Sequence, residues 1–144
     1  KVPPKFTTIE SIAAAIPDTD PLKSGGKWNV VALDKASDAV SHAVLQHPAQ
    51  LHVKIAVLEP YKEDGWGYRI MAPDDHISIR GAVLPYRIWI YFRPEEAESL
   101  IKLHKGSMIT VSGTLNRADI KMYGNAPTFS IDLTDAKVEP SPAP

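Results

Sequence analysis

Residues 103–113 read LHKGSMITVSG, and they decide the fold because they join the end of a helix to the start of a strand. Lys105 and Gly106 are typical of a helix C-terminus, where a cation meets the helix dipole and a glycine caps the last turn. The run from Met108 to Leu115 then has the apolar character of a strand. Gly113 within this run predicts a bulge or a sharp bend.

The segment before this stretch predicts a strand followed by a helix. Pro94 suits the first turn of a helix, and the glutamates that follow it favour the positive end of the helix dipole. The helix is therefore expected to run from Pro94 to the Gly106 cap. The preceding strand, from Arg87 to Phe92, alternates strictly: one face carries Ile88, Ile90 and Phe92, and the other carries Arg87, Trp89 and Tyr91.

Further strands are predicted on both sides of this unit. Leu51, Val53, Ile55 and Val57 alternate with other residues and indicate a strand with one buried face. Extended segments are expected over 66–71 and 77–83, and a last strand contains Phe129, Ile131 and Leu133. The stretch 117–126 is interpreted as a polar loop.

The first 49 residues have helical rather than strand periodicity. Thr7 and Glu10 match a capping box, which predicts a short helix that Pro17 closes. A second helix is expected from near Asp34 to before Pro48. We therefore predict three regions: a helical extension over 1–49 that packs on a barrel, the barrel over 50–138, and a Pro-rich disordered tail over 139–144.

This order of elements predicts a mainly β fold. Three or four strands, one helix and two further strands match a five-stranded Greek-key barrel of the OB type, with the helix between strands 3 and 4. An unrelated small α+β domain is the alternative.

Residues 103–113 and 129–136 carry a family resemblance as well. They resemble the fourth and fifth strands of OB-fold domains, and the nearest group is the bacterial OB-fold lipoproteins that are provisionally named nucleic-acid-binding and are similar to anticodon-binding domains. The resemblance implies nucleic-acid binding, and it favours a periplasmic or membrane-anchored location over the cytoplasm. The lipobox cysteine of such lipoproteins is not in this chain. The start at Lys1, without an initiator Met, is what a trimmed or mature chain would have.

Composition excludes several classes of function. The 16 Lys and Arg residues nearly balance the 17 Asp and Glu residues, so binding by bulk positive charge is excluded. The absence of cysteine among the 144 residues removes disulfides, cysteine-ligated metals and thiol catalysis. No apolar run approaches the ~18 residues that a membrane-spanning helix needs.

The predicted barrel places aromatic and basic side chains on one face. OB-type barrels bind ligands across strands 2 and 3, between the loop that joins strands 1 and 2 and the loop that joins strands 4 and 5. Rings stack on bases and cations follow phosphates, so these residues predict a site for single-stranded nucleic acid. The candidates are Tyr61, Lys62, Trp66, Arg69, Arg87, Trp89, Tyr91, Arg117, Lys121 and Tyr123.

Structural roles compete with this interpretation. Trp89 and Tyr91 could instead lie beneath the N-terminal helices. The Asp74-Asp75-His76 turn could be an acid/base or metal cluster, but adjacent turn residues point apart, which favours a solvated turn. The sequence contains no nucleophile elbow, phosphate loop or metal-ligand spacing. We therefore expect no enzyme activity, no cofactor and no metal.

Two other functions stay open at this point. One is a module of the bacterial cell envelope that binds a protein or a glycan, or that self-associates, and the overall charge balance suits it. The weaker one is an enzyme that uses the turn from Asp74 to His76.

Overall fold

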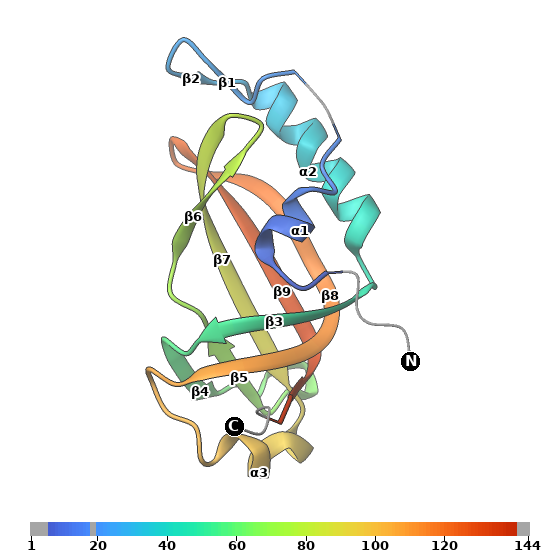
Figure 1. Cartoon of the computed structure of the whole chain (residues 1–144), viewed down its shortest axis with the longest axis vertical. Coiled ribbons are helices and arrows are strands. Elements are labelled where there is room, and N and C mark those ends of the chain that lie inside the picture. The colour runs from blue at the N-terminus through green and yellow to red at the C-terminus, as the bar shows by residue number, and fades with distance from the viewer. Residues whose placement is uncertain (1–5, 18–19, 141–144) are drawn as a thin grey trace.

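The computed structural model describes residues 6–17 and 20–140 (Figure 1). The fold is mainly β, with helices at both ends of a twisted sheet. Of the tail predicted over 139–144, residues 141–144 lie outside the described part. The backbone N–H of Glu139 donates to the Thr110 carbonyl at 2.8 Å.

The N-terminal extension contains the two predicted helices and a small hairpin. Helix α1 spans Ile9–Ala13, and helix α2 spans Val30–Val44. Strands β1 (Lys23–Ser24) and β2 (Lys27–Trp28) pair between them. The capping box of α1 uses Thr8 and Ser11 rather than the predicted Thr7 and Glu10, so the prediction was wrong by one residue.

The main sheet has seven strands. Its hydrogen-bonded order is β3-β8-β9-β7-β5-β4, and β6 pairs with β7 at the side. All pairs are antiparallel except β7 with β9, which is parallel. The strands are β3 (Pro48–Lys54), β4 (Val57–Pro60), β5 (Tyr68–Met71), β6 (Asp75–Ile79), β7 (Ala82–Phe92), β8 (Met108–Tyr123) and β9 (Ala126–Val138).

The predicted closed barrel of five strands is therefore not what the pairing gives: the strands number seven, and β3 and β4 at the two ends of the path are not paired with each other. The extra strands arise where the chain changes partner. The Ile55 N–H donates to the Ser107 carbonyl at 2.9 Å, whereas the next N–H, that of Ala56, donates to the Met71 carbonyl at 2.9 Å on the other side. A second interruption, over 72–74, separates β5 from β6.

The core lies on the inner face of the sheet, where the alternating apolar residues meet. Ile90, Phe92, Phe129 and Ile131 are fully buried there, and each such side chain contributes roughly 1.5–3 kcal/mol by leaving water. The strict alternation predicted for residues 87–92 is confirmed. The predicted bulge at Gly113 is confirmed as well, because the β8–β9 register shifts between Ser112 and Thr114.

The helix between β7 and β8 is shorter than predicted. It consists of a 3-10 turn, η2 (Pro94–Glu96), followed by one turn of α-helix, α3 (Ala97–Leu100). Leu100 is the one buried residue of α3, so packing against the sheet stabilises only this single helical turn. The predicted cap at Gly106 lies beyond this helix, although Gly106 does adopt a positive φ of 94°.

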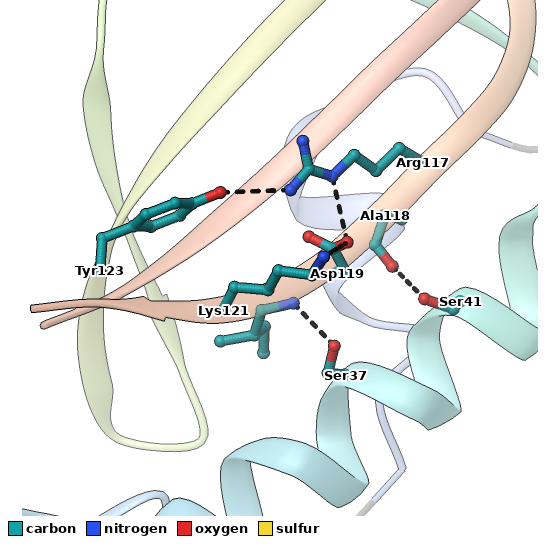
Figure 2. A network of polar contacts seen from close by, with 8 residues as sticks. Ser37, Ser41, Arg117, Ala118, Asp119, Lys121 and Tyr123 are labelled. Carbon is teal, nitrogen blue, oxygen red and sulfur yellow. Dashed lines mark hydrogen bonds and ion pairs between the residues drawn. The ribbon is translucent and has the colours of Figure 1, made fainter.

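Helix α2 lies along the second half of β8, which contains Ala118 and Ile120 (Figures 1 and 2). The Ser41 hydroxyl donates to the Ala118 carbonyl at 2.5 Å, and the Ile120 N–H donates to the Ser37 hydroxyl at 2.9 Å. Both N-terminal helices therefore sit at the end of the sheet away from β4 and β5 (Figure 1). Trp89 and Tyr91 pair instead with β5, and they remain half-buried rather than fully covered.

Candidate nucleic-acid interface

Four of the predicted aromatic residues come together on the outer face of the sheet. Tyr91 of β7 lies at 5.4 Å from Tyr61 and at 5.8 Å from Trp66, measured between ring centroids. Tyr61 follows β4, and Trp66 follows the 3-10 turn η1 (Glu63–Gly65), so both rings belong to the loop between β4 and β5. Trp89 is on the same face as Tyr91, two residues earlier on β7.

Guanidinium groups lie between these rings. The Arg69 guanidinium carbon is 4.4 Å from the Tyr61 ring and 4.4 Å from the Trp89 ring. The Arg93 guanidinium carbon lies 3.9 Å from the Trp66 ring. Such contacts hold flat, polarisable surfaces in fixed orientations. We call Tyr61, Trp66, Arg69, Trp89 and Tyr91 the aromatic face.

Strand register explains why residues far apart in sequence form this face. Arg69 is the cross-strand partner of Tyr91 on β7 and of Glu59 on β4. Directly opposite residues in a sheet point to the same side, so one outward position on each of three strands brings these side chains together. The alternation of β7 then adds Trp89.

Each arginine near the face is paired with an acidic residue. Arg69 donates to Glu59 from Nε at 3.0 Å, and Arg93 donates to Asp135 from Nε at 2.9 Å. Arg87 lies 3.5 Å from Asp74. These ion pairs largely neutralise the arginines near the face. Sequence reasoning did not predict the pairs of Arg69 and Arg93, because their partners Glu59 and Asp135 lie on other strands, β4 and β9.

The residues predicted on the second loop are on a strand instead. Strand β8 continues to Tyr123, and β9 begins at Ala126, so the polar loop predicted over 117–126 is reduced to a tight turn. Ala118 and Ile120 are buried and alternate with outward polar residues, and this alternation was the signal for a strand. The prediction failed because the outward residues made the segment look uniformly polar.

Arg117, Lys121 and Tyr123 form their own polar network on β8 (Figure 2). Arg117 donates to Asp119 at 3.0 Å and to the Tyr123 hydroxyl at 3.2 Å, and Lys121 lies 3.9 Å from Asp119. The structure gives no direct contact of Lys121 or Tyr123 with the aromatic face. The ammonium group of Lys62 lies 4.8 Å from the ring of Tyr68. Tyr68 is next to Arg69 on β5 and therefore points to the opposite side of the sheet from the aromatic face. Arg87 and Trp89 line a small hollow at the edge of the face.

Asp132 of β9 lies between the aromatic face and the polar network of β8, and sequence reasoning did not identify it. Its cross-strand partners are Trp89 on β7 and Arg117 on β8. Burial raises the pKa of Asp132 to about 6; Arg117 lowers that pKa, Asp119 raises it, and Arg69 lowers it. Burial also raises the pKa of Tyr91, and Asp132 raises it further. The Asp132 carboxylate is therefore close enough to interact both with the aromatic face and with the polar network of Arg117.

We expect Asp132→Asn to stabilise the chain at high pH. The pKa of Asp132 is about 6 in the folded chain and about 3.9 in an unfolded one. The folded state therefore binds the proton more tightly, and stability falls as the pH rises from about 4 to about 6. Asparagine avoids this loss, so the variant should gain about 1–2 kcal/mol at pH 8, after solvent screening. Urea denaturation at pH 4 and pH 8 measures it.

The same experiment on Asp34→Asn provides the control, because Asp34 is an exposed residue of α2. As a substitution on the solvent side of a helix, it should change the free energy of unfolding by no more than about 0.5 kcal/mol. An Asp132→Asn variant with an equal effect at pH 4 and pH 8 would contradict the buried setting of this carboxylate.

The structure also places the Asp74-Asp75-His76 turn and the side chains that could ligate a metal. The described residues contain no group of three or more His, Cys, Asp and Glu side chains that could hold a metal ion. In the Asp74-Asp75-His76 turn, the Asp75 carboxylate accepts the His76 backbone N–H at 2.8 Å, which is ordinary turn chemistry. Within the described residues, no helix is both long and apolar enough to cross a membrane.

The chain is similar in part to several solved structures, among them the following three. A lipoprotein of Klebsiella pneumoniae, provisionally named nucleic acid-binding, is 16% identical with a TM-score of 0.44, over 77% of this chain and 82% of that one. A small single-stranded DNA-binding protein of Streptomyces coelicolor is 13% identical with a TM-score of 0.37, over 61% and 87%. A mitochondrial single-stranded DNA-binding protein of S. cerevisiae is 12% identical with a TM-score of 0.37, over 65% and 94%. No family model and no curated protein matches the chain.

Proposed function

We propose that residues 50–138 form an OB-type barrel in which β3 with β4, and β5 with β6, each count as one bent strand. Five strands then remain, in the order 1-4-5-3-2-1, because β3 and β4 lie at opposite ends of the pairing path. The parallel pairing of β7 with β9 supports this, since it joins the third and fifth strands of the barrel. The helices of residues 1–49 are an extension on this barrel.

We propose that the aromatic face of this barrel binds single-stranded nucleic acid. The observation that carries the proposal is the continuous row of stacked groups: the rings of Trp66, Tyr91 and Tyr61 adjoin one another, and the Arg69 guanidinium lies between the rings of Tyr61 and Trp89. Bases stack on such surfaces with about 1–3 kcal/mol each and with little dependence on sequence. The face also spans β5 and β7, where OB-type barrels bind ligands.

The paired arginines make this a site led by stacking rather than by charge. Arg69, Arg87 and Arg93 each have an acidic partner, so a phosphate must compete with a carboxylate for every one of them. We therefore expect micromolar affinity at low salt and a shallow dependence on salt concentration.

Trp89→Ala should weaken the binding of single-stranded oligonucleotides about tenfold, because it removes one stacking surface. Fluorescence anisotropy with labelled DNA and RNA oligomers at low salt measures the effect. The matched control is Trp28→Ala: Trp28 is likewise half-buried beside a cation, with Lys23 at 4.6 Å, but it belongs to the β1–β2 hairpin. Equal binding by both variants, or no binding by the unaltered chain, would contradict the proposal.

The paired charges also favour a second candidate, a module that binds a protein or glycan of the cell envelope. A neutral surface of rings and ion pairs suits a polar macromolecular interface as well. In that case the anisotropy experiment shows no binding, and Trp89→Ala abolishes either a partner recovered by pulldown or self-association of the chain in sedimentation. The location, periplasmic or otherwise, stays a prediction.

A further inference from the structure

The outward side of β9 is a strip of small polar residues between two rows of larger ones. Thr128, Ser130 and Thr134 are polar yet buried, and Asp132 is half-buried among them. On the β7 side their partners include Arg87 and Trp89, and on the β8 side Arg117, Asp119 and Lys121. Asp132 is therefore the one acidic residue of this strip, and it lies opposite Trp89, which we propose as a stacking residue.

The carboxylate of Asp132 has no hydrogen bond or ion pair with any side chain of the described residues. The acidic residues around it differ in this respect: Glu59, Asp74, Asp119 and Asp135 all pair with arginines. The charged and titratable groups that interact with Asp132 are Arg117 and Asp119 of β8, Arg69 of β5 and Tyr91 of β7. Arg117 is already bonded to Asp119 and Tyr123.

An ionised carboxylate only accepts hydrogen bonds, so a ligand group that pairs with Asp132 must be a donor. Leaving such an acceptor partly desolvated costs free energy, which a donor from a ligand recovers. Trp89 and Asp132 lie directly opposite each other on β7 and β9, so the edge of a base stacked on Trp89 can reach the Asp132 carboxylate. Guanine offers two parallel donors on its Watson–Crick edge, N1–H and the N2 amino group, which match the two oxygens of one carboxylate. Thymine and uracil offer a single N–H flanked by two carbonyl oxygens, which a carboxylate repels.

We propose that Asp132 makes the aromatic face selective for guanine in single-stranded nucleic acid, by accepting two hydrogen bonds from the edge of a base stacked on Trp89. This inference rests on the proposed function. It assigns to Asp132 a specificity role separate from stacking: the rings supply affinity for any base, and the carboxylate distinguishes among bases.

The test compares three single-stranded DNA probes of 12 nucleotides, which share a thymidine sequence and differ only in the bases at alternate central positions. One is all thymidine, one has guanine at alternate central positions, and one has hypoxanthine there, which lacks only the N2 amino group. We expect the guanine probe to bind about tenfold more tightly than the all-thymidine probe, as one good bidentate base contact allows. The hypoxanthine probe should fall between them, because one of its two hydrogen bonds is lost.

Asp132→Asn should bring the affinities of the three probes close together while it retains binding of the thymidine probe. Asp34→Asn, on α2, should keep the tenfold preference. The preference should also shrink for the unaltered chain at pH 5, where a protonated Asp132 no longer accepts two bonds, and stay constant with pH for Asp132→Asn.

Two results would overturn the inference, and they differ. If the chain binds all three probes equally while Trp89→Ala still weakens binding, the selectivity is wrong and the proposed function stands. If the chain binds none of the probes, the proposed function fails and the selectivity fails with it. An Asp132→Asn variant that keeps the guanine preference also overturns the assignment, because another residue must then provide it.

Discussion

The triple variant Glu59→Gln, Asp74→Asn, Asp135→Asn should bind single-stranded DNA about 100-fold more tightly than the unaltered chain at 0.1 M salt. The three substitutions free Arg69, Arg87 and Arg93 from their ion pairs. The chain then has 16 basic residues against 14 acidic ones instead of 17. Each new phosphate contact on a single strand steepens the dependence of log K on log salt by about 0.7. Anisotropy titrations from 50 to 200 mM salt should therefore show a slope steeper by about 2.

The structure makes these three positions suitable for the change. Asp135 has a positive φ of 50°, a conformation that asparagine adopts readily. The pairs of Arg87 with Asp74 and of Arg93 with Asp135 join side chains that are all more than a third exposed, so losing each costs at most about 1 kcal/mol of stability. The Arg69 side chain is only 19% exposed, so the loss of its partner costs more, about 1–3 kcal/mol. The variant should therefore stay folded.

The control carries the same change in net charge on a different surface. Glu10→Gln, Asp34→Asn and Asp38→Asn lie on α1 and α2, where all three residues are exposed. Only long-range attraction can then change, and salt screens it beyond about 10 Å at 0.1 M. If both triple variants gain affinity equally, Arg69, Arg87 and Arg93 are not the phosphate contacts.

The pattern of β7 shows how far sequence alone could lead to this site. Strict alternation placed Trp89 and Tyr91 outward and Ile90 inward, because a half-buried strand has a period of two. The same rule, applied to Ala118 and Ile120, would have found the second half of β8. Where the alternation is recognised, local pattern therefore identifies a strand and the side on which each of its residues lies.

Register was out of reach, and register determines the chemistry of the site. The pairing of Glu59 with Arg69 depends on which residues face each other across β4 and β5. Likewise, the unpartnered carboxylate of Asp132 depends on both neighbouring strands, and its partner Arg117 bonds to Asp119 instead. Such facts depend on how the strands pair, which periodicity does not encode.

Gly67→Ala should destabilise the chain by about 2–3 kcal/mol, the upper part of the usual cost of overpacking. Gly67 is buried where the start of β5 meets the segment before α3. Its N–H donates to the Phe92 carbonyl at 2.9 Å, and its carbonyl accepts the Tyr61 N–H at 3.0 Å. A Cβ at Gly67 would lie 2.7 Å from the Pro94 Cα and 2.8 Å from the Pro94 nitrogen. Because these are backbone atoms, the two segments must separate.

This separation should reduce binding as well as stability. Tyr61 is hydrogen-bonded to Gly67 and Trp66 precedes it, so a displaced Gly67 carries both rings away from Tyr91. Thermal denaturation followed by circular dichroism should show a loss of about 5–10 °C for a chain of this size. Below the new transition, the affinity for oligonucleotides should still fall about tenfold, the equivalent of one lost stacking surface.

Gly81→Ala separates this steric effect from the general cost of replacing a glycine. Gly81 has a φ of 81°, and a Cβ there meets no atom within 4 Å, so alanine costs only about 1–2 kcal/mol of backbone strain. It lies in the β6–β7 turn and should leave oligonucleotide affinity unchanged. At Gly67 the situation is the opposite: an added Cβ clashes with the Pro94 backbone, and the backbone conformation itself causes no strain. A Gly67→Ala variant that melts with the unaltered chain and binds equally well would show that the loop of Tyr61 and Trp66 is not held by this close approach, and that the aromatic face is assembled in another way.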